Sequence, residues 1–324
     1  MTHAIRINET GGPEVLRWEE LALPEPGPGE ARVRHHAVGL NFIDIYHRSG
    51  LYPLPLPSGI GLEGAGVVEA VGSGVAELRP GDRVAYAGGP VGAYAEARNL
   101  PADRLVPLPA AIDFKSGAAM MLQGMTAQYL LRRTYRVQAG DTILIHAAAG
   151  GVGLIVCQWA KALGATVIGT VGSDDKAELA RAHGCDHAIV YSRENFTARV
   201  REITGGAGVP VVYDSIGKDT FFASLDCLRP LGMMVCFGSS SGPVPPLDTG
   251  ELARRGSLFL TRPTLFTYAA RRDDLLQMAG ELFEVVASGK VKIEVRQTYA
   301  LKDAARAQTD LAARRTTGST VLLP

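Results

Sequence analysis

The distribution of hydrophobic and polar positions divides the chain into two patterns. Before Phe114, short apolar runs alternate with Gly and Pro, as in EARVRHHAVGL (30–40), EGAGVVEAVG (63–72) and GDRVAYAGG (81–89). Runs of this length between turn residues predict short strands. The alternation within RVRHHAV predicts a strand that buries one face. We therefore expect the first part of the chain to form a compact, β-rich, barrel-like domain.

A different pattern begins at Phe114, where residues 114–133 have helical spacing and few helix breakers. From Asp141 onward, continuously apolar runs such as TILIHAA (142–148) alternate with helical segments such as SDDKAELARAHG (173–184). This alternation is typical of βαβ units, and strands that are apolar throughout are typical of a parallel sheet covered on both faces.

The last part of the chain predicts a long helix over 270–290, a strand, a short helix over 302–315 and a final strand at 319–324. This segment is too short to form a domain of its own. We expect it to pack back onto the first domain, which leaves a cleft between two domains.

Composition narrows the class of protein. The 324 residues include 33 basic and 33 acidic side chains, so the formal net charge is zero and gives no electrostatic footprint for nucleic acid or an anionic membrane. None of the four cysteines forms a C-x-x-C pair, which favours reduced thiols. No signal peptide is visible, and the longest uncharged stretch, 142–160, contains three glycines. We expect a soluble, cytoplasmic protein.

A glycine cluster, AAGGVG (148–153), lies between a predicted strand and a predicted helix. Gly150 and Gly151 let backbone N–H groups approach a pyrophosphate, and Gly153 lets the helix pack close to the strand. The free amides at the helix start attract phosphate. Ala148 replaces the first glycine of the usual pattern, but the strand before and the helix after favour a dinucleotide-binding turn over a plain tight turn.

The end of the next strand discriminates between the two nicotinamide dinucleotides. An Asp or Glu usually holds the free ribose 2′-hydroxyl there, but Val171 occupies this position, followed by Gly172 and Ser173. Ser173 can donate to a 2′-phosphate, and Lys176 can supply positive charge. The acidic pair at 174–175 speaks against a 2′-phosphate, but these two residues could instead cap the N-terminus of the next helix. We therefore predict NADPH.

Longer motifs resemble the medium-chain dehydrogenase/reductase superfamily, and within it the NADPH-dependent quinone oxidoreductases of the ζ-crystallin-like type. They are NFIDIYHRSGLYPLPLPSGIGLEGAGVVEAVGSGV (41–75), AAAGGVGLIVCQWAKALGATVIGTVGS (147–173), VVYDSIG (211–217) and GSLFLTRPTL (256–265). The resemblance implies an α/β chain with a GroES-like β-rich barrel domain over 1–122 and 262–324. It implies a Rossmann domain, a doubly wound parallel sheet, over 123–261. It also implies a homodimer joined by edge strands of the Rossmann domains, for which GSLFLTRP (256–263) is the candidate.

The same resemblance implies which residues contact NADPH. They are Phe42 and Tyr46 at the nicotinamide end, Thr126 and Tyr129 below it, Gly150, Gly151 and Val152 at the pyrophosphate, Gly172, Ser173, Lys176 and Tyr191 around the adenosine phosphate, Ser215, Phe237 and Ser240 along the cleft, and Arg314 near the C-terminus. Arg315 is the rival of Arg314.

Zinc ligands typical of the superfamily are missing. The zinc-dependent branch places a Cys and a His where this chain has Asn41 and Leu62, and its lobe of four closely spaced cysteines is also missing. The cluster HGCDH (183–187) contains the right residue types, but Gly184 is expected to end a helix and a strand to begin near His187. We therefore predict no metal site.

Chemistry without a Lewis acid favours an electron-poor acceptor. A quinone or conjugated carbonyl delocalises the charge that hydride transfer creates, so modest hydrogen-bond donors suffice. Asn41, Tyr46 and Tyr52 are the candidate catalytic donors, although each could instead pack or hold backbone. We expect an NADPH:quinone oxidoreductase working in the interdomain cleft. Two alternatives remain: a reductase of α,β-unsaturated carbonyls, and an NADPH-binding structural or RNA-associated protein, against which the neutral charge speaks.

Overall fold

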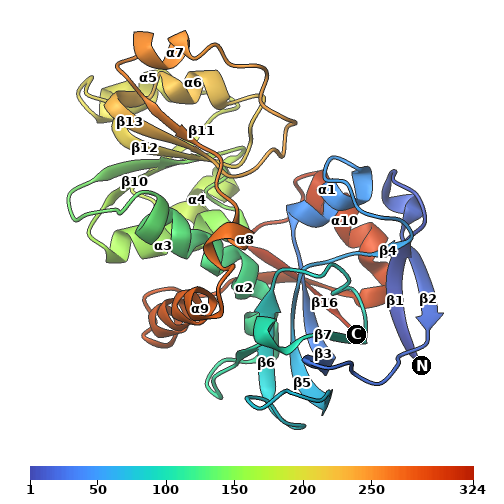
Figure 1. The fold of residues 1–324 in the computed structure, drawn as a ribbon. Helices are drawn as coiled ribbons and strands as arrows, with labels where there is room; N and C mark the ends of the chain where they lie inside the picture. Colours follow the sequence, from blue (N-terminus) through green and yellow to red (C-terminus); the bar gives the residue numbers. More distant parts are fainter. The chain divides into compact units, whose positions relative to one another are not determined.

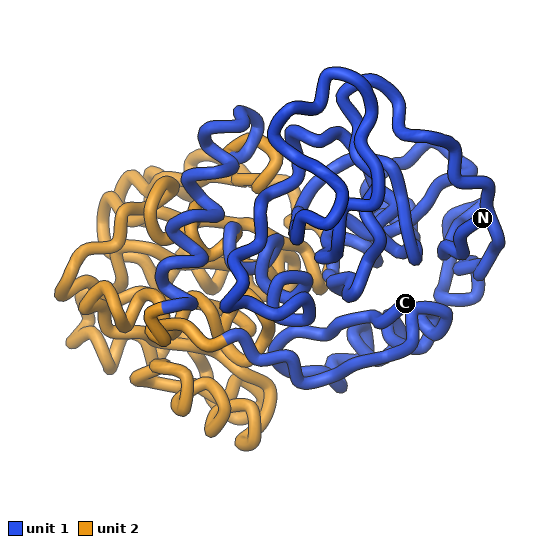
Figure 2. Tube along the Cα trace, turned by 90° about the horizontal axis from the view of Figure 1, so that it is seen from below, with its two compact units in different colours: residues 1–125, 269–287, 293–324 blue, residues 126–268, 288–292 orange.

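The structure is a computed structural model that describes all residues from Met1 to Pro324. The chain forms two compact units, coloured separately in Figure 2. Unit 1 comprises 1–125, 269–287 and 293–324, and unit 2 comprises 126–268 and 288–292. No helix combines the length and the apolar character that crossing a membrane requires.

Unit 1 is built mainly of strands (Figure 1). The strands are β1 (Thr2–Ile7), β2 (Arg17–Leu21), β3 (Glu30–Leu40), β4 (Ser58–Gly59), β5 (Glu63–Val71), β6 (Arg83–Ala87), β7 (Ala97–Pro101), β8 (Val106–Pro107), β15 (Val295–Ala300) and β16 (Ser319–Leu323). The helices are α1 (Phe42–Ser49), α9 (Arg272–Ala287) and α10 (Ala304–Ala312), with short 3-10 turns η1 (Pro13–Val15), η2 (Ala102–Arg104) and η4 (Leu301–Asp303).

The strand β3 organises the larger sheet of unit 1. This seven-stranded sheet has the order β15-β16-β3-β5-β6-β8, and β7 also pairs with β3. Buried and more exposed positions alternate along the first part of β3, which confirms the strand predicted for 30–40. The final strand β16 pairs antiparallel with β3, so the C-terminal end of the chain completes a sheet begun near its N-terminus.

Unit 2 is a layered α/β structure. Its strands are β9 (Thr142–Ile145), β10 (Thr166–Val171), β11 (His187–Val190), β12 (Val209–Asp214), β13 (Leu228–Cys236) and β14 (Phe259–Thr261). Its helices are α3 (Gly151–Ala162), α4 (Asp174–Ala182), α5 (Phe196–Ile203), α6 (Phe221–Leu225), α7 (Gly250–Arg254) and α8 (Leu265–Tyr268). The helix α2 (Phe114–Tyr129) runs from unit 1 into unit 2 and continues as a π-helical turn, η3 (Leu130–Thr134).

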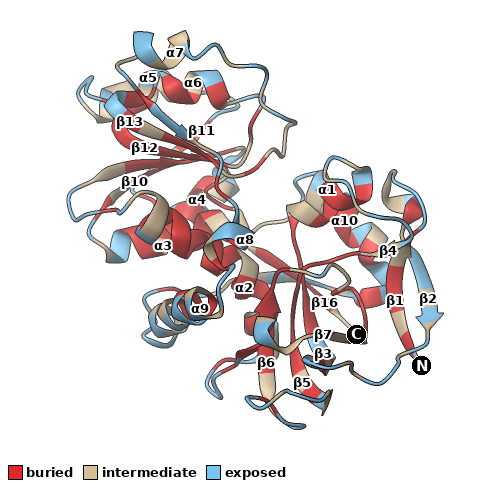
Figure 3. Ribbon diagram, viewed as in Figure 1, coloured by how far each residue is buried: buried red, intermediate tan, exposed pale blue.

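The sheet of unit 2 has the order β11-β10-β9-β12-β13-β14, and all of its strand pairs are parallel. Chain order therefore reverses between β9 and β12, which makes the sheet doubly wound and creates a switch point where such sheets bind ligands. Every residue of β12 is buried, and the strand is red in Figure 3, while three of the four residues of β9 are buried. Burial on both faces explains why these strands read as continuously apolar.

The alternating pattern predicts a helix over TFFASLDCLRP (220–230) and a strand over GMMVCFG (232–238), and the structure differs from both. The helix expected over 220–230 is only the five-residue α6, and β13 begins at Leu228 rather than at Gly232. Pro230 and Leu231, which has a positive φ of 59°, lie inside β13. The pairing with β12 is irregular at this point, so the turn-like residues are accommodated as a bulge that the apolar pattern did not reveal.

Candidate functional site

The glycine cluster forms the turn from β9 into α3 in unit 2. Gly150 caps α3 in an extended conformation, and Gly151 is the first helical residue. A Cβ on Gly153 would lie 2.3 Å from the carbonyl oxygen of Ala147, so only glycine permits this approach of helix and turn. The amide of Gly150 already donates to Ala147 O at 2.9 Å. The amides that open the helix toward a ligand are therefore those of Gly151, Val152 and Gly153.

Other residues expected at the cofactor follow successive strands of the same parallel sheet. Ser173 comes after β10, Tyr191 after β11, Ser215 after β12 and Ser240 after β13. Because parallel strands end at one edge, all four lie along the edge that carries the glycine turn. Tyr191 also reaches back to β10, since a Cβ on Gly172 would lie 2.9 Å from the Tyr191 hydroxyl oxygen.

At the adenosine end of this edge, β10 does not end on a carboxylate. Val171 is buried, and Ser173 is the N-cap residue of α4, with Lys176 half-buried in its first turn. Asp174 accepts two hydrogen bonds from Arg193, at 2.6 and 2.7 Å, and these hold the pKa of Asp174 below its usual value. The sequence analysis missed Arg193, although a basic residue just after β11 was a signal for it.

The end of β12 is tied to the end of β13. The buried carboxylate of Asp214 accepts from the amides of 216–217 at 2.7 and 3.0 Å and so fixes the turn that contains Ser215. The amide of Ser240 donates to Ser215 O at 3.1 Å, and the amide of Phe237 donates to Asp214 O at 2.8 Å. The structure therefore brings together Ser215, Phe237 and Ser240, as the sequence analysis expected.

A buried polar network below this edge was missed by the sequence analysis. His146 follows β9, and its ring nitrogens lie 2.8 Å from Thr170 Oγ1 and 2.8 Å from Ser224 Oγ. Ser224 Oγ in turn lies 3.5 Å from Asp214 Oδ2. Burial lowers the pKa of His146, so the ring is neutral and acts as a structural link between strand ends. The sequence contained a signal for this network, because one polar residue interrupts each of two apolar runs: His146 in TILIHA and Thr170 in VIGTV.

Thr126 and Tyr129 lie three residues apart on α2 and so share one face of it. The ring of Tyr129 stacks on Tyr268, with centroids 4.6 Å apart and planes 6° from parallel. Tyr268 also forms a 2.8 Å hydrogen bond with Thr134. Burial raises the pKa of Tyr129, which keeps its phenol a neutral donor.

In unit 1, Asn41 lies at the start of α1, directly after β3. Its side-chain Nδ2 donates to Glu63 Oε2 at 2.7 Å, and its Oδ1 accepts from Gln123 Nε2 at 3.1 Å. Its backbone amide donates to Asp44 at 2.9 Å. Glu63 also accepts from the amide of Leu122 at 2.8 Å. The sequence analysis did not identify Glu63 or Gln123, because neither stands near Asn41 in the chain.

The two carboxyl groups of this network are fully buried. Burial raises the pKa of Glu63 to about 8, against hydrogen bonds from Asn41 and the α2 backbone that lower it. Burial likewise raises the pKa of Asp44 to about 7, while its bonds from the Asn41 amide and from Tyr94 lower it. Each group therefore exchanges its proton near neutral pH rather than in acid.

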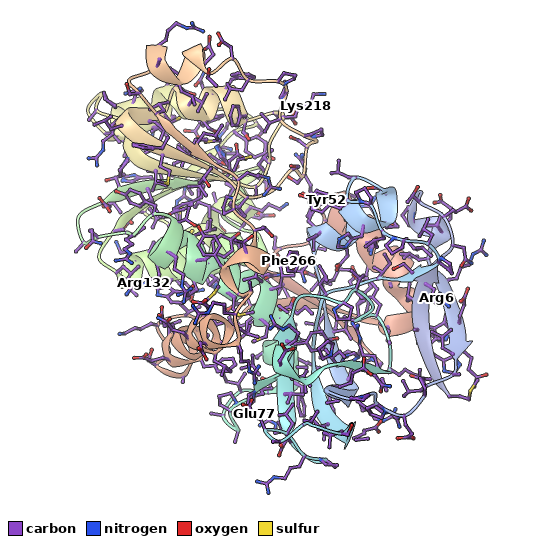
Figure 4. All side chains as sticks on the ribbon, viewed as in Figure 1. Arg6, Tyr52, Glu77, Arg132, Lys218 and Phe266 are labelled. Atoms are coloured by element: carbon purple, nitrogen blue, oxygen red, sulfur yellow. The ribbon has the colours of Figure 1, made fainter.

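Aromatic rings gather on α1 and on the loop that follows it. Tyr46 lies 6.0 Å from Phe42 between ring centroids and 5.1 Å from Tyr52 in an edge-to-face pair. Tyr52, labelled in Figure 4, lies on the loop after α1, and its amide donates to Tyr46 O at 3.1 Å. The structure therefore places the three aromatic residues of the motif in one cluster beside Asn41.

The structure also places the other residues weighed in the sequence analysis, which are Leu62, Arg314 with its rival Arg315, and the segment 183–187. Leu62 is buried. Arg314 is exposed with a positive φ of 58°, whereas its rival Arg315 forms an ion pair with Asp310 at 3.1 Å. In HGCDH (183–187), α4 ends before the cluster and β11 begins at its last residue, which confirms a helix-to-strand connection. No group of three or more His, Cys, Asp or Glu side chains in the structure could hold a metal ion.

Comparisons with known proteins cover nearly the whole chain. Residues 27–110 match the alcohol dehydrogenase GroES-like domain family, and residues 151–281 match the zinc-binding dehydrogenase family. The chain is 58% identical to a quinone oxidoreductase of Pseudomonas aeruginosa, over 100% of both chains. It is 49% identical to a 2-haloacrylate reductase of a Burkholderia species, over 100% of this chain and 99% of the relative.

Solved structures give the same result. The Escherichia coli quinone oxidoreductase complexed with NADPH matches with a TM-score of 0.98 and 50% identity, over 99% of this chain and 100% of that chain. The matches confirm the predicted combination of a GroES-like domain and a Rossmann sheet. The chain therefore belongs to the zinc-free quinone oxidoreductase family of the medium-chain dehydrogenases/reductases.

Proposed function

We propose that this chain is an NADPH:quinone oxidoreductase. The observation that carries the proposal is the adenosine end of the site in unit 2. There the end of β10 is apolar, and of the two carboxylates that open α4, Asp174 is paired with Arg193 at 2.6 and 2.7 Å. A 2′-phosphate would meet Ser173 and Lys176, and Arg193 offsets the charge of Asp174, while exposed Asp175 is the contrary feature. The names of the relatives and the NADPH complex of the E. coli protein support the same cofactor and acceptor.

The residues present fit a phosphorylated dinucleotide. The glycine turn offers free amides at the start of α3, and a side chain on Gly153 would collide with the backbone of this turn. NADPH supplies a hydride when bound. Around it we assign these contacts: Phe42, Tyr46, Thr126, Tyr129, Gly150, Gly151, Val152, Gly172, Ser173, Lys176, Tyr191, Ser215, Phe237, Ser240 and Arg314. Gly150 contributes by shaping the turn, because its own amide bonds to Ala147.

Asn41, Tyr46 and Tyr52 are the residues we assign to the acceptor. An amide or phenol donor stabilises negative charge that develops on a quinone oxygen. The Tyr46 and Tyr52 rings, 5.1 Å apart and edge to face, also supply aromatic surface against which an aromatic acceptor can pack. The reduced quinone can take its protons from water, so no dedicated acid is required.

Steady-state oxidation of NADPH and of NADH, each with 1,4-benzoquinone, tests the proposal. We expect kcat/KM to be at least about 10-fold higher with NADPH, a difference of about 1.4 kcal/mol. A preference for NADH, or no turnover with the quinone, contradicts the proposal.

A second candidate function is the reduction of α,β-unsaturated carbonyl compounds. One observation favours it: the 2-haloacrylate reductase is nearly as similar to this chain as several of the quinone oxidoreductases. NADPH oxidation with 2-chloroacrylate and with crotonaldehyde, beside 1,4-benzoquinone, separates the two functions. Turnover of an unsaturated carbonyl with no turnover of the quinone supports the second candidate.

We further propose a homodimer that forms along β14. This strand ends the sheet of unit 2, and Phe259 and Leu260 are 56% and 40% exposed. An apolar edge strand is a template for pairing with another chain. The four free, buried cysteines support a reducing compartment, which we take to be the cytoplasm. We retain 1–122 and 262–324 as the GroES-like domain and 123–261 as the Rossmann domain.

A further inference from the structure

The side-chain amide of Asn41 is held at both of its ends. Its Nδ2 donates to Glu63 Oε2 at 2.7 Å, and its Oδ1 accepts from Gln123 Nε2 at 3.1 Å. An amide nitrogen carries two hydrogens, so one N–H of Asn41 has no acceptor in the protein. Asn41 keeps 5% of its surface exposed, whereas Glu63 keeps none. Asn41 is therefore held in place by its partners and, unlike Glu63, is not completely closed off from solvent.

The partners of Asn41 are themselves fixed. Gln123 Oε1 accepts from Ser319 Oγ at 2.6 Å, which leaves the Gln123 amide nitrogen to face Asn41. Glu63 Oε1 accepts from the amide of Leu122 at 2.8 Å, which anchors the other carboxyl oxygen toward Asn41. Turning the Asn41 amide over would place its Nδ2 against Gln123 Nε2, donor against donor, so the Gln123 side chain fixes which way the Asn41 amide faces.

Strand register explains why these residues meet. In the larger sheet of unit 1, Leu40 lies opposite Thr320, and Val38 lies opposite Gly64. The residue after β3, the first residue of β16 and the first residue of β5 are therefore neighbours at one end of the sheet. These are Asn41, Ser319 and Glu63, and α2 brings Gln123 over the same end. All four of these residues are buried.

We propose that Gln123 and Glu63 are positioning residues that orient the Asn41 amide, so that its spare N–H donates to the carbonyl oxygen of the acceptor. The inference rests on the proposed function, because it assigns Asn41 to the acceptor. A donor that is already oriented stabilises developing negative charge without reorganisation during the reaction. Neither positioning residue touches the acceptor.

Gln123→Glu is the decisive variant. It keeps the size of the side chain but replaces the amide donor that Asn41 Oδ1 accepts from by a carboxylate oxygen. Asn41 Oδ1 then faces a second hydrogen-bond acceptor, so the Asn41 amide turns or moves away and its spare N–H no longer points to the quinone oxygen. Glu63→Gln is the second variant, because its amide nitrogen must face either Asn41 Nδ2 or the Leu122 amide, donor against donor.

A double-mutant cycle between Gln123→Glu and Asn41→Ala measures whether Gln123 acts through Asn41. General structural damage would lower kcat in both backgrounds alike. With NADPH and 1,4-benzoquinone, we expect Asn41→Ala to lower kcat about 100-fold and Gln123→Glu about 10-fold. In the Asn41→Ala background, Gln123→Glu should change kcat by less than about 2-fold. The Kd for NADPH should stay within about 2-fold in all variants. If the fold-decreases in kcat of the two single variants multiply in the double variant, the proposal is overturned.

Thr2→Val is the matched control, because it removes a buried hydrogen bond, from the Ala97 amide at 3.1 Å, elsewhere in unit 1. It should lower the melting temperature without affecting kcat. A crystal structure of Gln123→Glu tests the inference independently of activity: the Asn41 amide should be turned or displaced. An unmoved Asn41 amide overturns the inference, whereas a wild-type protein without quinone turnover overturns only the proposed function.

Discussion

Two buried carboxyl groups dominate the electrostatics of unit 1 at the scale of single residues. Burial raises the pKa of Glu63 from 4.5 to about 8, and that of Asp44 from 3.8 to about 7. A folded state that holds a proton more tightly than the unfolded state loses stability as pH rises between the two pKa values. The protein is therefore expected to be more stable at pH 5.5 than at pH 8.

Glu63→Gln tests this pH dependence. Removing one of the two titrating groups should reduce the loss of unfolding free energy between pH 5.5 and pH 8 by on the order of 2 kcal/mol. Urea unfolding at both pH values measures it. Glu69→Gln, at an exposed position of the same strand, is the control and should keep the wild-type loss. Equal losses in all three proteins would mean that Glu63 ionises normally in the fold.

The ion pair between Asp174 and Arg193 gives a second prediction at this scale. Arg193→Ala leaves the Asp174 carboxylate uncompensated beside Ser173, so it should raise the KM for NADPH by roughly 5-fold, about 1 kcal/mol, and leave the KM for NADH nearly unchanged. Asp174→Ala should lower the KM for NADPH, because the guanidinium is released. Arg199→Ala, which removes an exposed pair with Glu202, is the control. Parallel shifts for both cofactors would refute the assignment.

At the scale of elements, the turn from β9 into α3 depends on one missing side chain. Gly153→Ala places a Cβ 2.3 Å from a backbone oxygen that cannot move aside, so α3 must shift. We expect a loss of about 2 kcal/mol in unfolding free energy and a weaker Kd for NADPH, measured by urea unfolding and fluorescence titration.

Gly280→Ala is the matched control for that substitution. Gly280 is exposed within α9 and has no atom within 4 Å of a built Cβ, so alanine should stabilise the protein by up to about 1 kcal/mol. The Kd for NADPH should not change. If both glycine variants behaved alike, helix propensity and not close packing would explain the glycine at position 153.

At the scale of the whole molecule, the exposed edge of unit 2 predicts association. Replacing both Phe259 and Leu260 by Asp should convert a dimer into a monomer, because pairing along β14 would then bury charge. Light scattering after gel filtration measures the mass. Leu276→Asp, at an exposed apolar position of α9, should leave the mass unchanged. A wild-type protein with the mass of a single 34.3 kDa chain would contradict the dimer.

The sequence by itself determined the features that local pattern controls. Alternation along 30–40 predicted β3, continuous apolar runs predicted the parallel sheet, and the glycine cluster predicted the turn at the start of α3. Asn41 and Leu62 at the ligand positions already argued against zinc. These features depend on residues within one or two elements, where side-chain size and spacing fix the backbone.

Only the tertiary structure decided which side chains meet. Asn41 bonds to Glu63 at a separation of 22 residues and to Gln123 at 82, and Gln123 bonds to Ser319 at 196. Such partners are set by strand register and by where helices cross a sheet. Neither of these can be predicted from the hydrophobic periodicity of the sequence. Burial then shifts the pKa of the groups so gathered, and burial exists only once the core has closed around them.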